Sequence, residues 1–533
     1  MATVALSSTE GKWIMVSSIL ASAMAFIDST ALNVVLPSLQ KSLHATGTDL
    51  FWILNAYLLM LASLILIGGT LGDKLGRKKI FMWGIAIFIA GSAACGFATS
   101  VILLIVCRTL QGLGGALMIP GSLSLISSSI DEKERGKAIG TWSAFTTVVT
   151  IGGPIVGGAL ADAGLWRYIF FINIPIGLAA LLMLWRQVKE SRDTDSDKTL
   201  DYWGSIAIAL GLAALTFGFL RLPEIGFTNW QVYLSLSIGI LLLIAFIIIE
   251  KKSRHPMMPL HLFANSNFSG ANLLTFFLYA GLSAGMLFLS LNLVQVQGYS
   301  QLQSGLTFIP FTVLMIATAR FAGSLSDKYG PRLFLISGPV VAGIGLLILS
   351  FVQQTKGPAD YWTTFFPGIL VFGLGMSFTV VPLTSTVMGS VSDHLSGTAS
   401  GVNNAITRIA NVFANAIFGA LAVLLFSAAL HRQLNELPFN AKENQLIMTE
   451  AVNLGNAKVP ANFKDSDNLR IIDVYHLCFI NAYASILRIS AGLGFLGGMM
   501  SLIFIRNNIS KEKITNAAFN SSTPVIESST SKL

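Results

Sequence analysis

Long apolar runs alternate with short polar segments along almost the whole chain. When each run is read up to the Gly, Pro or charged residues that interrupt it, the pattern predicts fourteen helices of about 20 residues, the length that crosses a bilayer. The predicted spans lie near 13–36, 50–70, 80–99, 101–120, 136–160, 167–186, 203–221, 231–250, 268–293, 304–324, 333–353, 362–388, 397–428 and 478–505. The pattern therefore predicts an all-α polytopic membrane protein.

The composition favours the same class. Of 533 residues, 53% are hydrophobic and 11% are charged, whereas soluble chains carry about 25% charged residues. The net charge of +8 does not indicate nucleic-acid binding, because the cations gather in short loops between spans instead of on one face. The first span is long for a cleavable signal peptide, so we expect the N-terminus to stay attached.

Lys and Arg are concentrated in alternate loops. The basic loops are 71–79, 130–137, 186–202, 250–267 and 325–332. The short loops between them contain few cations, namely Lys41, Arg167, Arg221 and Lys356. The positive-inside rule therefore predicts that the basic loops and both termini lie in the cytoplasm, and that the chain is an integral protein of the cytoplasmic (plasma or inner) membrane.

One basic, glycine-punctuated loop occurs twice. The first copy, Gly69–Lys78, reads GTLGDKLGRK, and the second, at 323–332, reads GSLSDKYGPR. The copies follow the second and the tenth predicted spans, and Pro331 stands in the second copy where the first has Arg77. This internal repeat predicts two six-helix halves separated by an inserted pair of helices.

The repeat and the polar interruptions divide the chain into parts. We expect an N-terminal six-helix half, a cytoplasmic linker, an inserted helix pair, a C-terminal six-helix half with a long outer loop at 429–477, and a disordered cytoplasmic tail. Their expected bounds are 1–186, 187–202, 203–250, 251–505 and 506–533. The tail is rich in Ser, Thr, Asn and Lys, a composition typical of disorder.

Several charged residues fall inside predicted spans, where a charge costs at least about 2.5–3.5 kcal/mol on insertion scales and so usually faces a cavity or a partner. They are Asp28, Arg108, Glu250, Arg320, Arg408 and Arg488. Glu250 and Arg320 lie near span ends, and we expect both to reach the membrane interface. Asp28 is the carboxylate placed deepest in a span.

Asp28 and Arg108 are expected at the same depth, roughly 12 Å below the outer ends of their spans. A nearby Arg108 would favour the ionised form of Asp28, and separation of the two would favour the protonated form. The alternatives are a structural hydrogen bond for Asp28 and binding of backbone carbonyls by Arg108.

The loop Gly69–Lys78 resembles the signature loop of the major facilitator superfamily. Four further stretches resemble motifs of the fourteen-span drug/proton antiporter branch of that superfamily. They are Ile27–Pro37 in the first span, Leu104, Arg108, Gln111, Gly112 and Gly114 in the fourth, Gly152, Gly153, Pro154, Gly157 and Gly158 in the fifth, and Trp166–Gly177 at the start of the sixth. The chain is therefore similar to multidrug efflux proteins over nearly its whole length.

The resemblance implies a major facilitator fold, in which the two halves rock to expose a central cavity alternately. It also implies roles for three groups of residues. Asp28 and Arg108 would couple proton and substrate movements. The antiporter helix motif, Gly153, Pro154, Gly157 and Gly158, would form a kinked, closely packed seam. The alternative for this motif is a purely structural helix contact.

The third group is a conformational latch in the signature loop. Its residues are Asp73, Arg77, Gly69 and Gly76. Asp73 and Arg77 would pair with Glu132 or Glu134 in the next basic loop. The alternative is a solvated loop that serves only to orient the chain in the membrane.

The leading hypothesis is a secondary active transporter that exports lipophilic small molecules or drugs, cations included, by proton-coupled antiport and alternating access. No GxxxxGK[ST] phosphate loop occurs, which favours an ion gradient over ATP as the energy source. The expected partners are a small-molecule substrate, protons and the lipid bilayer. We expect a monomer with no cofactor, no metal site and no nucleic acid.

Three alternatives remain at this stage. An exporter of a lipid, siderophore or metabolite would carry the same motifs. A membrane-embedded enzyme using Asp28 is disfavoured, because the six histidines fall in or near loops and form no HExxH motif. A non-transporting receptor is disfavoured because both Asp28 and the Gly69–Lys78 loop are present.

Overall fold

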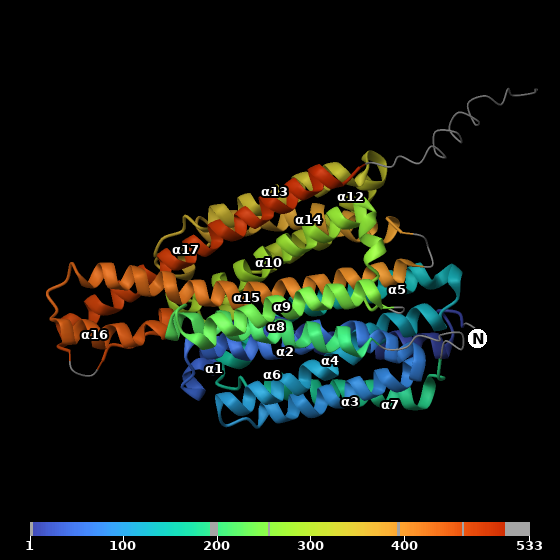
Figure 1. Ribbon diagram of the computed structural model, residues 1–533, viewed down its shortest axis with the longest axis horizontal. Coiled ribbons are helices and arrows are strands. Elements are labelled where there is room, and N and C mark those ends of the chain that lie inside the picture. Colours follow the sequence, from blue (N-terminus) through green and yellow to red (C-terminus); the bar gives the residue numbers. More distant parts are fainter. Residues whose placement is uncertain (1–3, 192–200, 254–255, 392–394, 461–462, 507–533) are drawn as a thin grey trace, which may run out of the picture.

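In the computed structural model, helices run side by side along the long axis of an elongated bundle (Figure 1). The residues described are 4–191, 201–253, 256–391, 395–460 and 463–506. The side chains of a few residues within helices, Asp73, Glu132 and Arg320 among them, lie outside this description. Most of the predicted linker and nearly all of the predicted tail lie outside it as well.

The described residues make fourteen helical passes. The first six are α1 (Thr9–Leu43), α2 (Gly47–Leu75), α3 (Arg77–Gly96), α4 (Val101–Ser129), α5 (Glu132–Asp162) and the consecutive α6 (Tyr168–Phe171) and α7 (Asn173–Gln187). The next two are α8 (Tyr202–Ile225) and α9 (Trp230–Lys252). The last six are α10 (Ser266–Gln295), the consecutive α11 (Gln301–Leu306) and α12 (Ile309–Tyr329), α13 (Pro331–Leu349), α14 (Phe365–Gly389), α15 (Ser396–Leu434) and α17 (Asp465–Phe504).

Short helices lie between some of these passes. They are η1 (Leu260–Ala264), η2 (Pro358–Asp360), α16 (Ala441–Thr449) and η4 (Glu450–Asn456). In the described part of the chain, 13 helices are long and apolar enough to cross a membrane, and α5 adds the shorter apolar stretch Val148–Asp162. The all-α membrane fold predicted from the apolar runs is confirmed, with helices at all fourteen predicted spans.

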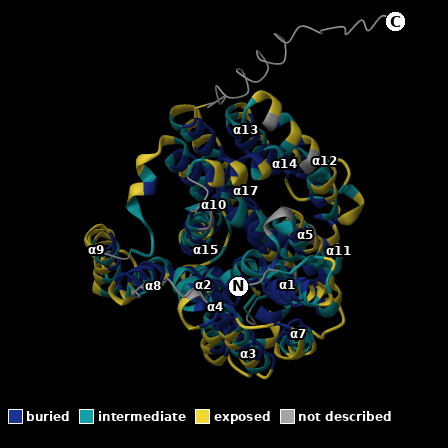
Figure 2. Ribbon diagram, turned by 90° about the vertical axis from the view of Figure 1, so that its right-hand side faces the viewer, coloured by how far each residue is buried: buried dark blue, intermediate teal, exposed yellow. Residues whose placement is uncertain are grey.

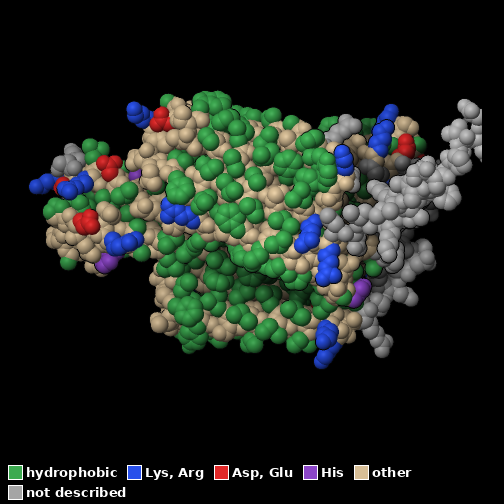
Figure 3. All heavy atoms as spheres, turned by 90° about the horizontal axis from the view of Figure 1, so that it is seen from above, with side chains coloured by type: hydrophobic (Ala, Val, Ile, Leu, Met, Phe, Trp, Pro, Cys, Tyr) green, Lys and Arg blue, Asp and Glu red, His purple; other side chains and the backbone are tan. Residues whose placement is uncertain are grey.

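The two ends of the bundle differ in charge. We call the end that holds the N-terminus and the loops at Gly76 and Gly330 the basic end, and the end that holds α16 and η4 the opposite end (Figure 1). On the face drawn in Figure 3, Lys and Arg side chains lie at both ends, but at the opposite end, on the left, they are mixed with Asp and Glu, and at the basic end they stand with few acidic residues. A broad hydrophobic belt lies between the two ends. Such a belt is the surface that a bilayer covers.

Both copies of the repeated loop reverse the chain at a single glycine. Gly76 (φ 115°) joins α2 directly to α3, and Gly330 (φ 85°) joins α12 directly to α13. Glycine adopts positive φ without the steric cost that other residues meet. The structure therefore places the repeated sequence at equivalent turns of the two six-helix halves.

The halves and the inserted pair are distinct when the bundle is viewed along its axis (Figure 2). Helices α12, α13, α14 and α17 lie in the upper part of that view, and α1, α3, α4 and α7 lie in the lower part. α8 packs against α2 and α15, while α9 packs against α8 at the periphery. The inserted pair therefore attaches to both halves through α8.

α2 and α15 pack antiparallel along much of their length. Gly419 of α15 lies against the Phe51 ring near the opposite end, and Gly401 faces Leu66 nearer the basic end. These two contacts set the register of the helices and bring the middle of α15 to the level of Tyr57.

α17 begins well before the predicted span at 478–505, at Asp465. The early part of α17 is amphipathic: Ile471 and Tyr475 are buried, and the Tyr475 hydroxyl donates to the Ile447 carbonyl of α16 at 3.2 Å. A helix that continues beyond the apolar run is stabilised by this packing, so apolarity alone did not locate its start.

Candidate functional site

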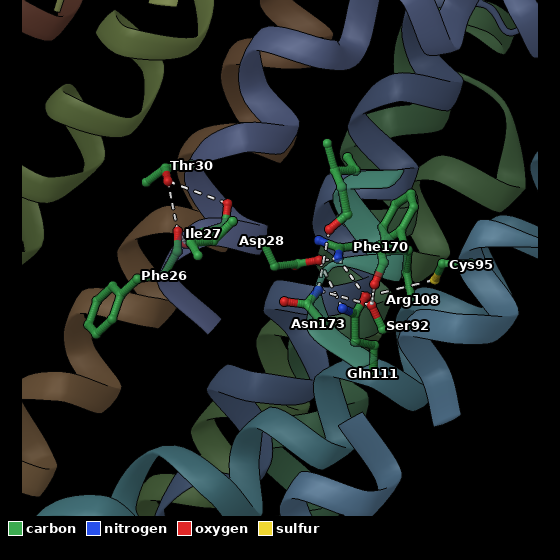
Figure 4. Close-up of polar contacts among 12 residues, drawn as sticks. Phe26, Ile27, Asp28, Thr30, Ser92, Cys95, Arg108, Gln111, Phe170 and Asn173 are labelled. Carbon is green, nitrogen blue, oxygen red and sulfur yellow. Dashed lines mark hydrogen bonds and ion pairs between the residues drawn. The ribbon is translucent and has the colours of Figure 1, made fainter. Parts of the chain in front are cut away.

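Asp28 of α1 lies in a closed hydrogen-bonded triad with Arg108 and Gln111 of α4 (Figure 4). Arg108 Nη1 donates to Asp28 Oδ2 at 2.5 Å and to Gln111 Oε1 at 2.7 Å, and Gln111 Nε2 donates to Asp28 Oδ1 at 2.8 Å. The i, i+3 spacing places Arg108 and Gln111 on one face of α4. Each carboxylate oxygen therefore receives a donor from that face.

The triad is sealed from solvent. Asp28 and Arg108 are each 1% exposed and Gln111 is 0% exposed. The Arg108 guanidinium carbon lies 4.5 Å from the centroid of the Tyr57 ring and 5.9 Å from that of Phe170. The two charges thus neutralise each other in an apolar, aromatic setting, and neither reaches a substrate in this arrangement.

A second polar cluster lies beside the triad and joins α3 to α6 and α7. Asn173 Nδ2 donates to Ser92 Oγ at 3.0 Å, and that hydroxyl donates to the Phe170 carbonyl at 2.8 Å (Figure 4). Asn173 belongs to the Trp166–Gly177 stretch singled out in the sequence. The cluster holds the backbone of Phe170, whose ring lies beside Arg108.

The glycines of the antiporter helix motif lie at two contacts of α5. Gly153 and Gly157 pack on Thr30 and Ala31, which lie in the same turn of α1 as Asp28. Gly158 packs on the Gln301 carbonyl of α11, and the Pro154 carbonyl faces Gly305 of the same helix. α5 therefore touches both the helix that carries Asp28 and the other half of the protein.

Asp162 strengthens the contact between α5 and α11. Its carboxylate accepts hydrogen bonds from Ser300 Oγ at 2.7 Å, Gln301 N at 2.8 Å and Leu302 N at 2.9 Å. A negative charge at the first turn of a helix satisfies free N–H groups and is electrostatically favourable. The two halves are thus joined at the opposite end, a contact that the sequence reasoning missed because no local pattern pairs Asp162 with residue 300.

The predicted latch lies only partly within the described residues, because the side chains of Asp73 and Glu132 are outside them. Glu134 accepts a hydrogen bond from Leu6 N at 2.6 Å. Arg77 donates through its backbone N to the Ser191 carbonyl at 2.8 Å and through Nη1 to Ser191 Oγ at 3.4 Å. The structure therefore brings Arg77 to the start of the linker.

Glu190 completes this contact at the basic end. Its carboxylate accepts from Lys78 N at 3.0 Å and from Lys79 N at 3.1 Å, so it caps the N-terminus of α3. A Cβ on Gly76 would lie 2.7 Å from the Glu190 carboxyl carbon, whereas one on Gly69 would lie 3.8 Å from Pro120. Glu190 was not expected from the sequence, because it lies in a polar linker more than a hundred residues away.

The other charges within the spans have varied environments. Glu250 is 2% exposed and accepts from Met258 N at 3.0 Å. The expectation that Glu250 reaches the interface was wrong, because the chain after α9 folds back over its carboxylate. Arg488 is exposed beside Phe351, and Arg408 is half-buried near the centre of the bundle.

Two repeated six-helix halves that meet at the opposite end, with a buried ion pair inside the first half, have the architecture of a membrane transporter. The family model of the Major Facilitator Superfamily matches residues 18–415. The chain therefore belongs to the major facilitator superfamily.

Several relatives of this chain are named as resistance or export proteins. The chain is 30% identical over 400 residues to the tetracenomycin C resistance and export protein of Streptomyces glaucescens, covering 75% of this chain and 73% of that protein. It is 31% identical over 415 residues to multidrug resistance protein Stp of Mycobacterium tuberculosis, covering 77% and 76%. It is 29% identical over 419 residues to the methylenomycin A resistance protein of Bacillus subtilis, covering 78% and 88%.

Solved structures support the fold. The chain aligns with a bacterial homologue of the human lysosomal transporter Spinster, in an inward-facing and unoccupied conformation, with a TM-score of 0.65, 18% identity, and coverage of 93% of this chain and 98% of that one. It aligns with the inward-open xylose transporter XylE of E. coli with a TM-score of 0.56, 14% identity, and coverage of 95% and 99%.

Proposed function

We propose that this protein exports lipophilic small molecules from the cell by proton-coupled antiport. The named relatives, whose names describe drug and antibiotic resistance or export, support the direction and the class of substrate. The proposal of proton coupling rests on the sealed triad around Asp28. Within the described part of α1–α7, Asp28 is the one acid that forms an ion pair with a buried arginine. Such a carboxylate changes protonation state when its counter-charge moves away.

The coupling runs through α1. Asp28 and the contact residues Thr30 and Ala31 lie within one turn of α1, and α5 packs on that turn while also packing on α11. Opening the contact between α5 and α11 therefore shifts the turn of α1 that carries Asp28. This shift separates Asp28 from Arg108, admits water and lets the carboxylate take a proton.

The proposed orientation places the basic end in the cytoplasm, where the positive-inside rule expects it. Because Asp162 and the α5 glycines join the halves at the opposite end, the conformation is closed to the outside. The contact of Glu190 and Ser191 with the signature loop lies at the basic end and acts as part of the conformational latch. A full cycle breaks the outer contact and forms a new one at the basic end.

The energy available is adequate for export. One proton that enters down a potential of about 100 mV releases about 2.3 kcal/mol. That free energy corresponds to an accumulation ratio of tens-fold for an uncharged substrate exchanged one for one.

The test is transport by purified protein in liposomes under an imposed proton gradient. Uptake of a fluorescent lipophilic substrate should require the gradient and collapse on addition of an uncoupler. Uptake of equal size with and without the gradient, in vesicles shown to hold active protein, would overturn the proposal of proton coupling.

A further inference from the structure

A stripe of polar residues lies along the middle of α15. Asn404, Arg408, Asn411 and Asn415 follow a spacing of four, three and four residues, so they share one helix face. Exposure falls along this stripe: Asn404 is exposed, Arg408 and Asn411 are half-buried, and Asn415 is buried. A solvent-accessible space that begins toward the basic end and narrows inward accounts for this order.

Arg408 faces the interior of the bundle and not lipid. α15 packs against both α2 and α10 and lies among the central helices in Figure 2. The Arg408 guanidinium is close enough to interact electrostatically with the phenols of Tyr57 on α2 and Tyr279 on α10. Since Arg408 keeps partial exposure among these helices, the space beside it is an internal one.

Hydrogen bonds hold α10 and α15 together on both sides of Arg408. On the side of the basic end, Asn403 Nδ2 donates to Asn272 Oδ1 at 3.0 Å and to Thr275 Oγ1 at 2.8 Å. On the other side, Ser283 Oγ donates to Asn415 Oδ1 at 3.2 Å. Both helices run away from the basic end, so these bridges place Arg408 and Tyr279 at the same level on a rigid two-helix platform.

The platform formed by α10 and α15 carries one positive charge, Arg408, without a counter-charge among the described residues. Within the described part of the chain, no hydrogen bond or ion pair reaches Arg408. Asp28 cannot serve as its counter-charge here, because both of its oxygens are occupied by Arg108 and Gln111. A guanidinium in the interior of a membrane bundle is most stable when an anion or a strong acceptor supplies the missing charge.

We propose that Arg408 and Tyr279 bind the ionised oxygen acid, a carboxylate or a phenolate, of a lipophilic substrate. The apolar part of that substrate lies toward Phe276 and Phe413, half-buried rings that meet edge to face at 6.2 Å between centroids. Arg408 offers a planar fork that matches a carboxylate, and Tyr279 adds a hydroxyl donor. This inference rests on the proposed export function and narrows its substrate class from lipophiles in general to lipophilic anions.

The charge of the substrate changes how transport is driven. Exchange of one monoanion for one entering proton moves two positive charges inward per cycle, whereas exchange of one monocation for one proton moves none. The membrane potential alone, without a pH difference, therefore drives export of an anionic substrate in this proposal.

The first test compares binding of three probes that differ only in their head group: pyrenebutyrate, pyrenebutanol and pyrenebutylamine, titrated into purified protein in lipid nanodiscs. The wild type should bind the carboxylate most tightly. Arg408→Gln should lose about tenfold in affinity for the carboxylate, as expected for a lost charge-assisted hydrogen bond, with little change for the alcohol. Tyr279→Phe should lose a smaller factor for the same probe.

Arg488→Gln is the matched control, because Arg488 is an exposed arginine of α17 beside Phe351. It should keep the carboxylate preference. If Arg408→Gln does not fold, Arg408→Lys takes its place and should keep the preference for an anion while weakening it, since an ammonium lacks the two-pronged geometry. An unchanged preference in a folded Arg408 variant, or tightest binding of the ammonium by the wild type, would overturn the proposal.

The second test separates this inference from the proposed function. In liposomes with a potassium-diffusion potential and no pH difference, wild-type protein should transport pyrenebutyrate, and Arg408→Gln should not. Head-group selectivity in binding without proton-driven transport would contradict the proposed function and leave the anion site standing. Proton-driven transport of a cation with no anion preference would contradict the anion site alone.

Discussion

Asp28, Arg108 and Gln111 show how a charge pair is tolerated inside a membrane bundle. Removing two charges from water costs several kcal/mol per ion, and their attraction offsets this cost only when further hydrogen bonds satisfy the remaining atoms. Gln111 supplies one of these bonds to each partner, because its amide donates to Asp28 and its carbonyl accepts from Arg108. Removing one charge should therefore cost more than removing both.

The prediction at this scale compares a single with a double variant. Asp28→Asn should leave Arg108 buried without a counter-charge and lower thermal stability by an amount corresponding to about 3–5 kcal/mol. Asp28→Asn combined with Arg108→Gln should regain most of that loss. Both variants should fail to couple transport to a proton gradient, because neither has an acid at position 28. Thermal unfolding followed by size-exclusion chromatography and gradient-driven uptake measure the two effects.

The outcome distinguishes a proton carrier from a structural ion pair. If the double variant were stable and still showed wild-type dependence on the proton gradient, another group would carry the proton. If Asp28→Asn alone were as stable as the wild type, loss of the counter-charge of Arg108 would not destabilise the fold, which would contradict the predicted loss of stability. Each result bears on one of the two roles separately.

The sequence predicted that Asp28 and Arg108 lie at the same depth, but it did not predict most of the residues that contact them. Both residues were predicted to face a cavity or a partner, because a charge inside a span is costly. Their common depth followed from the number of residues between each of them and the outer end of its span. The bonds from Gln111 and the contact with Tyr57 depend on how α2 and α4 are rotated about their axes. An almost uniformly apolar helix carries little information about that rotation, so these contacts appear only in the structure.

At the scale of elements, α5 is the helix that contacts both the turn of α1 carrying Asp28 and α11 of the other half. Its glycines allow contact with α1 and α11 at backbone distance. Its last residue, Asp162, holds α11 by three hydrogen bonds. Any side chain that separates α5 from α11 should therefore favour the conformation that is open at the opposite end.

Gly158→Ala tests this, with Gly152→Ala as the matched control in the same helix. A Cβ at Gly158 would lie 2.4 Å from the Gln301 carbonyl oxygen, whereas a Cβ at Gly152 meets nothing within 4 Å. Overpacking of this kind costs about 1–3 kcal/mol, so we expect roughly a tenfold shift toward the open state. The readout is the rate at which a maleimide modifies Ser304→Cys, a position that is 0% exposed.

The Gly152 variant should react at the rate of the parent protein. Equal rates for both variants would mean that the contact between α5 and α11 does not control access at the opposite end. A faster rate in the Gly152 variant alone would assign the control to a different face of α5.

The sequence predicted the membrane-spanning helices but not the polar contacts at their ends. Apolar runs located each span because burial in lipid requires them, but they did not mark the start of α17, which is stabilised by contact with α16. They also gave no indication that Glu190 caps α3. Two polar residues that are far apart in the sequence produce no periodic pattern of apolar and polar positions, so their contact cannot be predicted from such a pattern.

For the whole molecule, the repeated loop was the most informative feature of the sequence. Two copies in the same register predicted two six-helix halves, and the structure places Gly76 and Gly330 at equivalent turns between helices. The repeated loop did not predict how the two halves pack against each other. This packing depends on contacts such as Asp162 with Leu302, whose residues are far apart in the sequence.

Orientation in the membrane is the last prediction, and it follows from charge. The basic end carries Lys78, Lys79 and Lys189, and the positive-inside rule assigns such an end to the cytoplasm. An impermeant maleimide applied to intact cells should therefore label Lys442→Cys, at the opposite end in α16, but not Lys189→Cys. Both should be labelled after permeabilisation. The native cysteines Cys95, Cys107 and Cys478 are buried, so background labelling is low, and labelling of Lys189→Cys in intact cells would reverse both the orientation and the proposed direction of export.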